Sequence, residues 1–204
     1  QSNIVFHNYE TNKFTKFFIN DIDWKYNQIN YPSGIKGRLL GKLKNVNYEA
    51  KNTSVYKSDT TNELFGAVGY LAEINLFKKM RDNAAHLLTP KMLLRYAPGH
   101  MRKETENTRL NHSNVFKLDR LNTNKNFENG LSATLGFDYE INKSNKKIDF
   151  SIAQIINEKE NQNMPSSSSL NQRFSDVIGH SELQINDTIS LNYDFALDQN
   201  YKSL

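Results

Sequence analysis

Apolar and polar residues alternate without interruption through residues 131–141, LSATLGFDYEI. Successive side chains of a β-strand point to opposite faces, so this alternation predicts a strand with one apolar and one polar face. The run is about twice as long as an ordinary strand, and it matches the roughly nine to eleven residues with which a tilted strand crosses a bilayer. The apolar positions are Leu131, Ala133, Leu135, Phe137, Tyr139 and Ile141.

The same two-residue period recurs along the chain, whereas helical periodicity is nearly absent. It predicts further strands at residues 18–26, 35–43, 64–76, 88–96, 148–156, 177–185 and 189–197. A run at 115–121 is shorter and less regular, and we interpret it as one more strand. The fold class is therefore all-β, an antiparallel meander of about eight to ten strands.

The connections between these strands differ in length and composition. Residues 142–147 form a short polar turn, whereas residues 98–113 and 157–173 are long, hydrophilic and rich in residues that break strands. Short turns at one end and long loops at the other are typical of an outer-membrane β-barrel. A soluble β-sandwich also has uneven loops, so the pattern supports the barrel without deciding for it.

Composition narrows the class of membrane protein that is possible. No stretch approaches the eighteen or so consecutive apolar residues of a membrane helix, which excludes a helical membrane protein. An apolar content of 37% is compatible with a barrel, because only alternate residues of its strands face lipid. The chain begins at Gln1 without a signal peptide, and we expect residues 1–204 to be a single segment of a large transmembrane barrel domain.

The residue types argue against several other functions. The net charge of +4 is small and the basic residues are scattered, so we expect no nucleic-acid partner. There is no cysteine, and the serine run 166–169 lacks a nucleophile motif, so we expect no enzyme activity. The histidines show no metal-ligand spacing, and we expect them to be solvated or to flank strands, with no metal or cofactor. They are His7, His86, His100, His112 and His180.

Three cations are candidates for contact with phosphate. Lys91 and Arg95 lie on the polar parity of strand 88–96, and Arg102 follows in the adjoining loop. If the apolar parity meets lipid, these cations line a wet interior and could attract the phosphate groups of a passing substrate. On the same assumption, the lipid-facing residues are Leu131, Leu135, Phe137, Tyr139, Leu191, Tyr193 and Phe195.

A set of motifs in fixed order brings a known family into view. They are LLTPKMLLRYAPGHMR at 87–102, NVFKLDRLN at 114–122, ENGLSATLGFDYE at 128–140, NQRFSDVIG at 171–179 and SLNYDFALD at 190–198. In this order and spacing the chain resembles the C-terminal barrel of LptD, the lipopolysaccharide-assembly family also known as organic solvent tolerance proteins. The resemblance covers residues 87–198, and the earlier residues fit the same barrel by periodicity.

The resemblance implies a function and a set of partners. LptD-like proteins sit in the cell outer membrane and combine a periplasmic jellyroll with a very large barrel, which an LptE-like lipoprotein plugs. Lipopolysaccharide arrives along the periplasmic Lpt bridge, to which the jellyroll connects. It then passes into the barrel lumen and leaves through a lateral gate, and no covalent chemistry is needed. This chain would be part of the barrel wall; it contains no match to the jellyroll and none of the family's disulfide cysteines. The alternatives are another outer-membrane barrel, such as a porin or receptor, and a soluble β-sandwich binding module.

Overall fold

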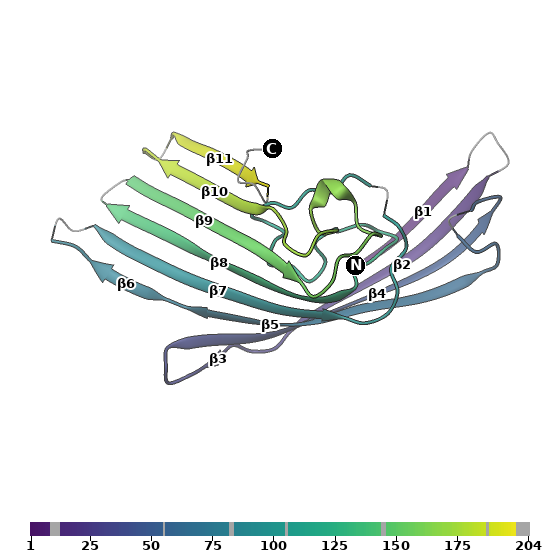
Figure 1. Cartoon of the computed structure of the whole chain (residues 1–204), viewed down its shortest axis with the longest axis horizontal. Coiled ribbons are helices and arrows are strands. Elements are labelled where there is room, and N and C mark those ends of the chain that lie inside the picture. Colours follow the sequence, from purple (N-terminus) through teal and green to yellow (C-terminus); the bar gives the residue numbers. More distant parts are fainter. Residues whose placement is uncertain are drawn as a thin grey trace.

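A computed structural model describes residues 1–8, 13–54, 56–81, 84–104, 106–143, 146–186 and 188–198. Its strands form one curved antiparallel sheet in the order β1-β2-β4-β5-β7-β8-β9-β10-β11, with the short strands β3 and β6 paired to β4 and β7 (Figure 1). The strands are β1 Ser2–Asn8, β2 Phe14–Lys25, β3 Ile29–Asn30, β4 Ile35–Lys51, β5 Thr61–Ile74, β6 Leu76–Lys79, β7 Ala85–Ala97, β8 Gly130–Lys143, β9 Lys146–Asn157, β10 Val177–Gln184 and β11 Ser190–Leu197.

The predicted all-β antiparallel meander is confirmed, and several strands are longer than the sequence pattern indicated. The strands β2, β4, β5, β7, β8 and β9 have between 12 and 17 residues. Neighbouring strands on the main path pair antiparallel, and the β7–β8 register runs unbroken from Ala85 opposite Asn142 to Ala97 opposite Gly130. This length and continuity agree with strands that cross a bilayer.

Two details of the strand prediction were wrong. Residues 115–121 are turn and bend instead of a strand. Their apolar side chains recur at intervals of three residues, Val115, Leu118 and Leu121, and all three are buried as anchors of an irregular loop. The predicted strand 64–76 is broken at Asn75, close to Pro90 on the neighbouring strand β7. Proline has no N–H to donate, which accounts for the interruption of this ladder between the pairs Glu73–Lys91 and Leu76–Leu88.

The two longest connections lie at the same end of the sheet. Residues 98–129 and 158–176 connect strands at one end, whereas the β8–β9 connection at the opposite end spans only residues 144 and 145, which lie outside the described residues. The two long segments fold back over the concave side of the sheet (Figure 1). The first of them, which we call the cap loop (98–129), begins and ends next to Gly99 and Gly130, both at positive φ. Glycine adopts this conformation without a Cβ clash, so the chain can turn sharply at both junctions.

The hydrophobic core lies between the sheet and these long segments. One cluster joins strand residues such as Phe17, Val46 and Leu93 to Leu118 and Phe127 of the cap loop. A second cluster joins Ile155 and Ile178 to Val115, Leu121 and Leu170. In the described residues the strands belong to a single sheet, so the core is not the space between two sheets that defines a β-sandwich.

Helical structure is limited in the described part of the chain to the short 3₁₀ turn η1, Ser166–Ser168. No helix among these residues has the length and apolar character needed to span a membrane.

Candidate functional site

The convex face of the sheet exposes large apolar side chains on every long strand. Leu135 on β8 is 45% exposed and Tyr193 on β11 is 66% exposed. Cross-strand neighbours share a face, so the register places Met92 beside Leu135, and Tyr139 beside Phe150. Exposed members on other strands include Phe18, Ile22, Trp24, Leu39, Leu43, Leu64, Val68, Leu94, Tyr96, Leu131 and Leu191. An apolar surface of this extent on a folded chain marks contact with another apolar phase or partner.

The concave face is charged, and the cap loop binds it through Arg95. This residue is 1% exposed on β7. Its Nε donates to the carbonyl of Leu118 at 2.7 Å, its Nη2 donates to the carbonyl of Glu128, and its Nη1 lies 3.5 Å from a Glu128 carboxylate oxygen. A buried guanidinium is tolerated only when charge and hydrogen bonds compensate it, and here the cap loop supplies both.

A second buried arginine completes this network from within the cap loop. Arg120 Nε donates to Glu128 Oε2 at 2.8 Å, and its Nη2 donates to the second oxygen of the same carboxylate. The same Nη2 donates to Ser132 Oγ on β8 at 2.8 Å. The Glu128 carboxylate therefore forms ion pairs with both Arg95 and Arg120, and the pair Arg120–Glu128 holds the cap loop against the sheet.

A lysine on β4 holds the next part of the cap loop. The Nζ of Lys44 lies 3.0 Å from Asp119 Oδ2 and donates to the carbonyl of Thr123, and both charged side chains are buried. The neighbouring Lys42 on the same face pairs with Asp23 at 3.2 Å. Two separate strands, β4 and β7, thus bind the cap loop by buried cations.

Arg102, within the cap loop, lies in an aromatic enclosure at the side of β4 and β5. Its guanidinium carbon is 5.6 Å from the Tyr48 ring centroid, 5.3 Å from that of Tyr56 and 5.7 Å from that of Phe65. It also donates to the Glu63 carboxylate. Burial lowers the pKa of Arg102 below its ordinary value, although the neighbouring charges act in the opposite direction.

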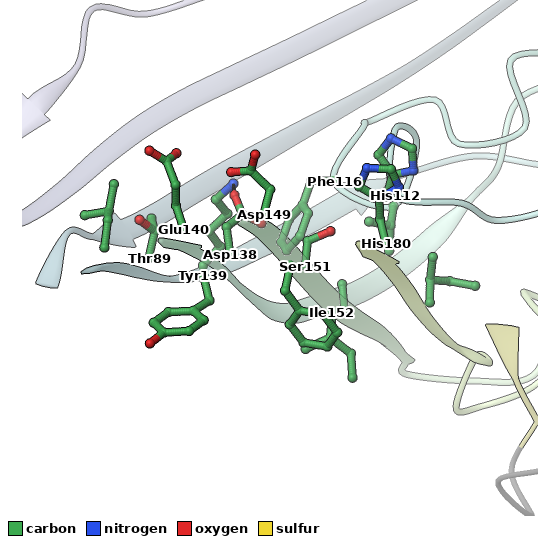
Figure 2. Close-up of a pocket in the computed structure, with 16 residues that line it drawn as sticks. Thr89, His112, Phe116, Asp138, Tyr139, Glu140, Asp149, Ser151, Ile152 and His180 are labelled. Carbon is green, nitrogen blue, oxygen red and sulfur yellow. Dashed lines mark hydrogen bonds and ion pairs between the residues drawn. The ribbon is translucent and has the colours of Figure 1, made fainter. Parts of the chain in front are cut away.

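Lys91 borders an open cavity of about 340 Å³ on the concave side (Figure 2). Its Nζ pairs with Asp138 across the β7–β8 ladder and lies 5.9 Å from the Phe116 ring centroid. Glu140 and Asp149 also line this cavity and point away from Tyr139 on the opposite side of the sheet (Figure 2). The cavity therefore places charges of both signs beside apolar side chains such as Val115 and Ile178.

A comparison with protein families assigns the chain. The family model for LptD, described as LPS transport system D, matches residues 35–204. The chain belongs to the LptD family. It matches none of the curated proteins with which it was compared. LptD proteins act in lipopolysaccharide transport and assembly at the outer membrane, and the all-β sheet with its two unlike faces agrees with a piece of an outer-membrane β-barrel.

The match to LptD extends the resemblance that the motifs indicated. It begins at residue 35, so it includes β4 and β5, which the motifs beginning at residue 87 did not reach. The family is one of transport and assembly proteins, which separates the chain from a porin, a receptor or a soluble binding module.

The cations predicted from the sequence of this LptD chain all lie on the concave side or in the loop that covers it. Each is paired with a carboxylate: Lys91 with Asp138, Arg95 with Glu128, and Arg102 with Glu63. Of these three cations, only Lys91, with a side chain 23% exposed, also borders the cavity of about 340 Å³.

The predicted apolar residues share the convex face of the LptD sheet. Leu131, Leu135, Leu191 and Tyr193 are exposed there, and Phe137, Tyr139 and Phe195 are half-buried among neighbouring side chains. Thr134 lies on the opposite, polar face of the same strand, where it is 0% exposed beneath the cap loop and donates to the carbonyl of Val115 at 3.3 Å.

Two groups of polar residues in this LptD chain were missed by sequence reasoning. The carboxylates Asp119 and Glu128 and the guanidinium of Arg120 lie in an irregular loop, where no periodicity signals burial. The structure also joins His112, His180 and Asp194, which are far apart in the sequence. In the sequence, the one indication that these side chains could meet was that His180 and Asp194 occupy polar positions in the alternating patterns of two consecutive predicted strands.

Proposed function

We propose that this chain is part of the barrel wall of an outer-membrane lipopolysaccharide translocon, and that transport there is non-catalytic. Lipopolysaccharide would travel through the barrel lumen and leave through a lateral gate between strands. The proposal rests on membership of the LptD family together with one structural feature, the separation of an exposed apolar face from a charged, loop-covered face. A substrate with a phosphorylated head and acyl chains requires both a wet interior and an apolar exterior.

In this proposal the convex face contacts the lipid of the outer membrane. The residues assigned to lipid are Leu131, Leu135, Phe137, Tyr139, Leu191, Tyr193 and Phe195. Within lipid every backbone polar group needs a partner, so the edges of β1 and β11 would pair with further strands of a closed barrel. Since the longer loops of such barrels face the cell exterior, we place the end with residues 98–129 and 158–176 on the outside.

The concave face would line the lumen, with Lys91 as the first phosphate contact. Lys91 borders the cavity, and a phosphate would compete with Asp138 for its ammonium group. Phosphate contact at Arg95 and Arg102 requires a change in the conformation of the cap loop. In the structure, carbonyl groups of the cap loop accept hydrogen bonds from both guanidinium groups. Arg95 would meet substrate only when the cap loop leaves the face, and Arg102, which belongs to this loop, only when it leaves Glu63 and the carbonyl of Lys125.

The partners follow from the family. We propose an LptE-like lipoprotein plug within the lumen and a periplasmic Lpt bridge that connects through a jellyroll domain. Energy for transport would then come from elsewhere in this machine. Co-purification of a lipoprotein with the intact barrel would support the plug, and a conducting barrel without such a partner would contradict it.

Site-specific photocrosslinking tests the transport path directly. A photoreactive residue at position 91 of the intact protein should form a lipopolysaccharide adduct in cells that is lost when cellular energy is depleted. The matched position is 135 on the convex face, where any adduct reports resident membrane lipid and should persist after depletion. An energy-independent adduct at 91, or no adduct there, would contradict the luminal path.

A further inference from the structure

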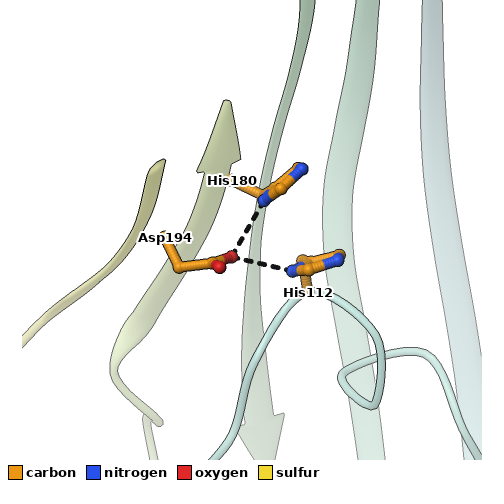
Figure 3. Close-up of side chains that lie close together, drawn as sticks. All are labelled: His112, His180 and Asp194. Atoms are coloured by element: carbon orange, nitrogen blue, oxygen red, sulfur yellow. Dashed lines mark hydrogen bonds and ion pairs between the residues drawn. The ribbon is translucent and has the colours of Figure 1, made fainter. Parts of the chain in front are cut away.

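Three side chains with metal-binding donor atoms converge on the concave side of the sheet (Figure 3). His112 belongs to the cap loop, His180 to β10 and Asp194 to β11. The Nδ1 atoms of both histidines lie 2.9 Å from the same oxygen, Asp194 Oδ1. One donor atom from each residue lies within 4.8 Å of the others.

The two strand residues are positioned by the sheet register. His180 and Asp194 are directly opposite each other in the antiparallel β10–β11 pair, so their side chains leave the same face at one level. The neighbouring pair on this face, Ile178 and Ala196, packs into the second hydrophobic cluster. The backbone beneath these two ligands is therefore fixed by the fold.

The cap loop presents His112 from an equally well-defined turn. Asn111 Oδ1 accepts hydrogen bonds from the backbone N–H of Ser113 at 2.9 Å and from its hydroxyl at 2.7 Å. On either side of the turn, Leu110 and Val115 are buried in the second hydrophobic cluster. His112 is thus held over the strands by anchors both before and after it.

The donor atoms of the two imidazoles and the carboxylate are close enough to share one ion. The rings stack at a centroid distance of 4.0 Å and an interplanar angle of 24°, so ligation requires the side chains to turn until both nitrogen lone pairs point at the ion. Neighbouring ligands of a tetrahedral Zn²⁺ ion are about 3.3 Å apart when each bond is about 2.0–2.1 Å. The N–O separations of 2.9 Å would need to widen by only a few tenths of an ångström to admit the ion.

We propose that His112, His180 and Asp194 form a binding site for a divalent transition-metal ion, with Zn²⁺ as the best match. Two imidazoles and one carboxylate suit Zn²⁺, whereas Ca²⁺ and Mg²⁺ prefer oxygen ligands alone. His112 and Asp194 are exposed, so water can complete the coordination. The bound ion clips the cap loop to β10 and β11, at the opposite side of the loop from its attachment to Lys44.

The site is tested by metal titration of the full chain in detergent after treatment with a chelator. Zn²⁺ should bind with a stoichiometry of about one ion per chain, and loss of a ligand should weaken binding at least about tenfold. The variants are His112→Ala, His180→Ala and Asp194→Asn, of which the last keeps an oxygen that accepts hydrogen bonds. His86→Ala is the matched control, since His86 pairs with Tyr139 at 2.7 Å outside the cluster, and its affinity should be unchanged.

A second readout uses the folded wild-type protein and does not depend on the stability of the variants. Zn²⁺ should protect the cap loop from trypsin cleavage after Arg109 and Lys117, two exposed residues on either side of His112. Co²⁺ should give the visible absorption of a ligand-bound ion, and Zn²⁺ should displace it. A folded wild type that binds neither ion stoichiometrically, or equal Zn²⁺ affinity in His112→Ala, His180→Ala and the control, would overturn the proposal.

Discussion

Glu128 and Arg120 are eight positions apart in one loop and form a buried two-point ion pair against the wall of the sheet. Arg120 Nε donates to Glu128 Oε2 at 2.8 Å, and neither side chain is more than 2% exposed. Because Arg95 from β7 also reaches Glu128, one carboxylate joins the cap loop to the strand. Glu128 is therefore the carboxylate that links the cap loop to Arg95 on β7.

Removal of this carboxylate should release the cap loop. Glu128→Ala leaves Arg95 and Arg120 buried without their carboxylate, and breaking a buried pair by loss of one partner costs about 3–5 kcal/mol. Limited trypsin digestion of the chain in bilayers should then cut the cap loop faster than in wild type. Glu140→Ala is the control, because its side chain is 31% exposed and its partner Lys147 is also at the surface. Equal digestion of the two variants would refute the role given to Glu128.

The two faces of the sheet should respond differently to a new charge. Leu135→Arg places a cation on the convex face and should cost about 2–4 kcal/mol near the bilayer midplane. Asn192→Arg, on the concave side of β11 and opposite Glu182, should cost less than about 1 kcal/mol. Urea unfolding in vesicles, followed by the emission of the single residue Trp24, measures both values. Similar costs at the two positions would contradict the orientation of the sheet.

The strands and their faces could be predicted because both follow from local alternation. A two-residue period fixes which side chains share a face, and the register of each hairpin then aligns these faces, as in Tyr96 opposite Leu131. The cap loop could not be predicted in the same way, because its contacts join residues far apart in the sequence. Thr134 shows the consequence: alternation correctly opposes it to Leu135, but only the structure shows that Val115 covers it.

The candidate site was predicted in the same partial way. Lys91 and Arg95 could be selected because both occupy polar positions in the alternating pattern of one strand, and both extend from the concave face. Their acidic partners, Asp138 and Glu128, lie on the next strand and at the end of a long loop. Ion pairing between a cation and a distant carboxylate depends on the strand register and on the path of the loop. This pairing decides whether the cation remains available to a ligand.

Asp176, in the long connection before β10, should reduce stability as it ionises. Burial raises the pKa of its carboxyl above the ordinary value, despite a hydrogen bond from Ser169 that acts in the opposite direction. The folded state therefore holds this proton more tightly than the unfolded state, so the cost of ionisation is absent below the ordinary pKa and complete above the raised one. Asp176→Asn removes this titration. As pH rises from the ordinary carboxyl pKa to the raised pKa of the folded state, the variant should therefore gain stability relative to wild type. Urea midpoints measured across the interval test this, and a constant difference between the two proteins would contradict it.

Spin-label accessibility along β8 tests most directly the claim that one face of this sheet meets lipid. The chain has no cysteine, so single cysteines at residues 131–141 can carry a nitroxide without background labelling. In bilayers, oxygen accessibility should peak at 131, 133, 135, 137, 139 and 141. It should be low at the positions between them, where the cap loop covers Ser132 and Thr134. A flat profile, or oxygen maxima at the even positions, would contradict the account.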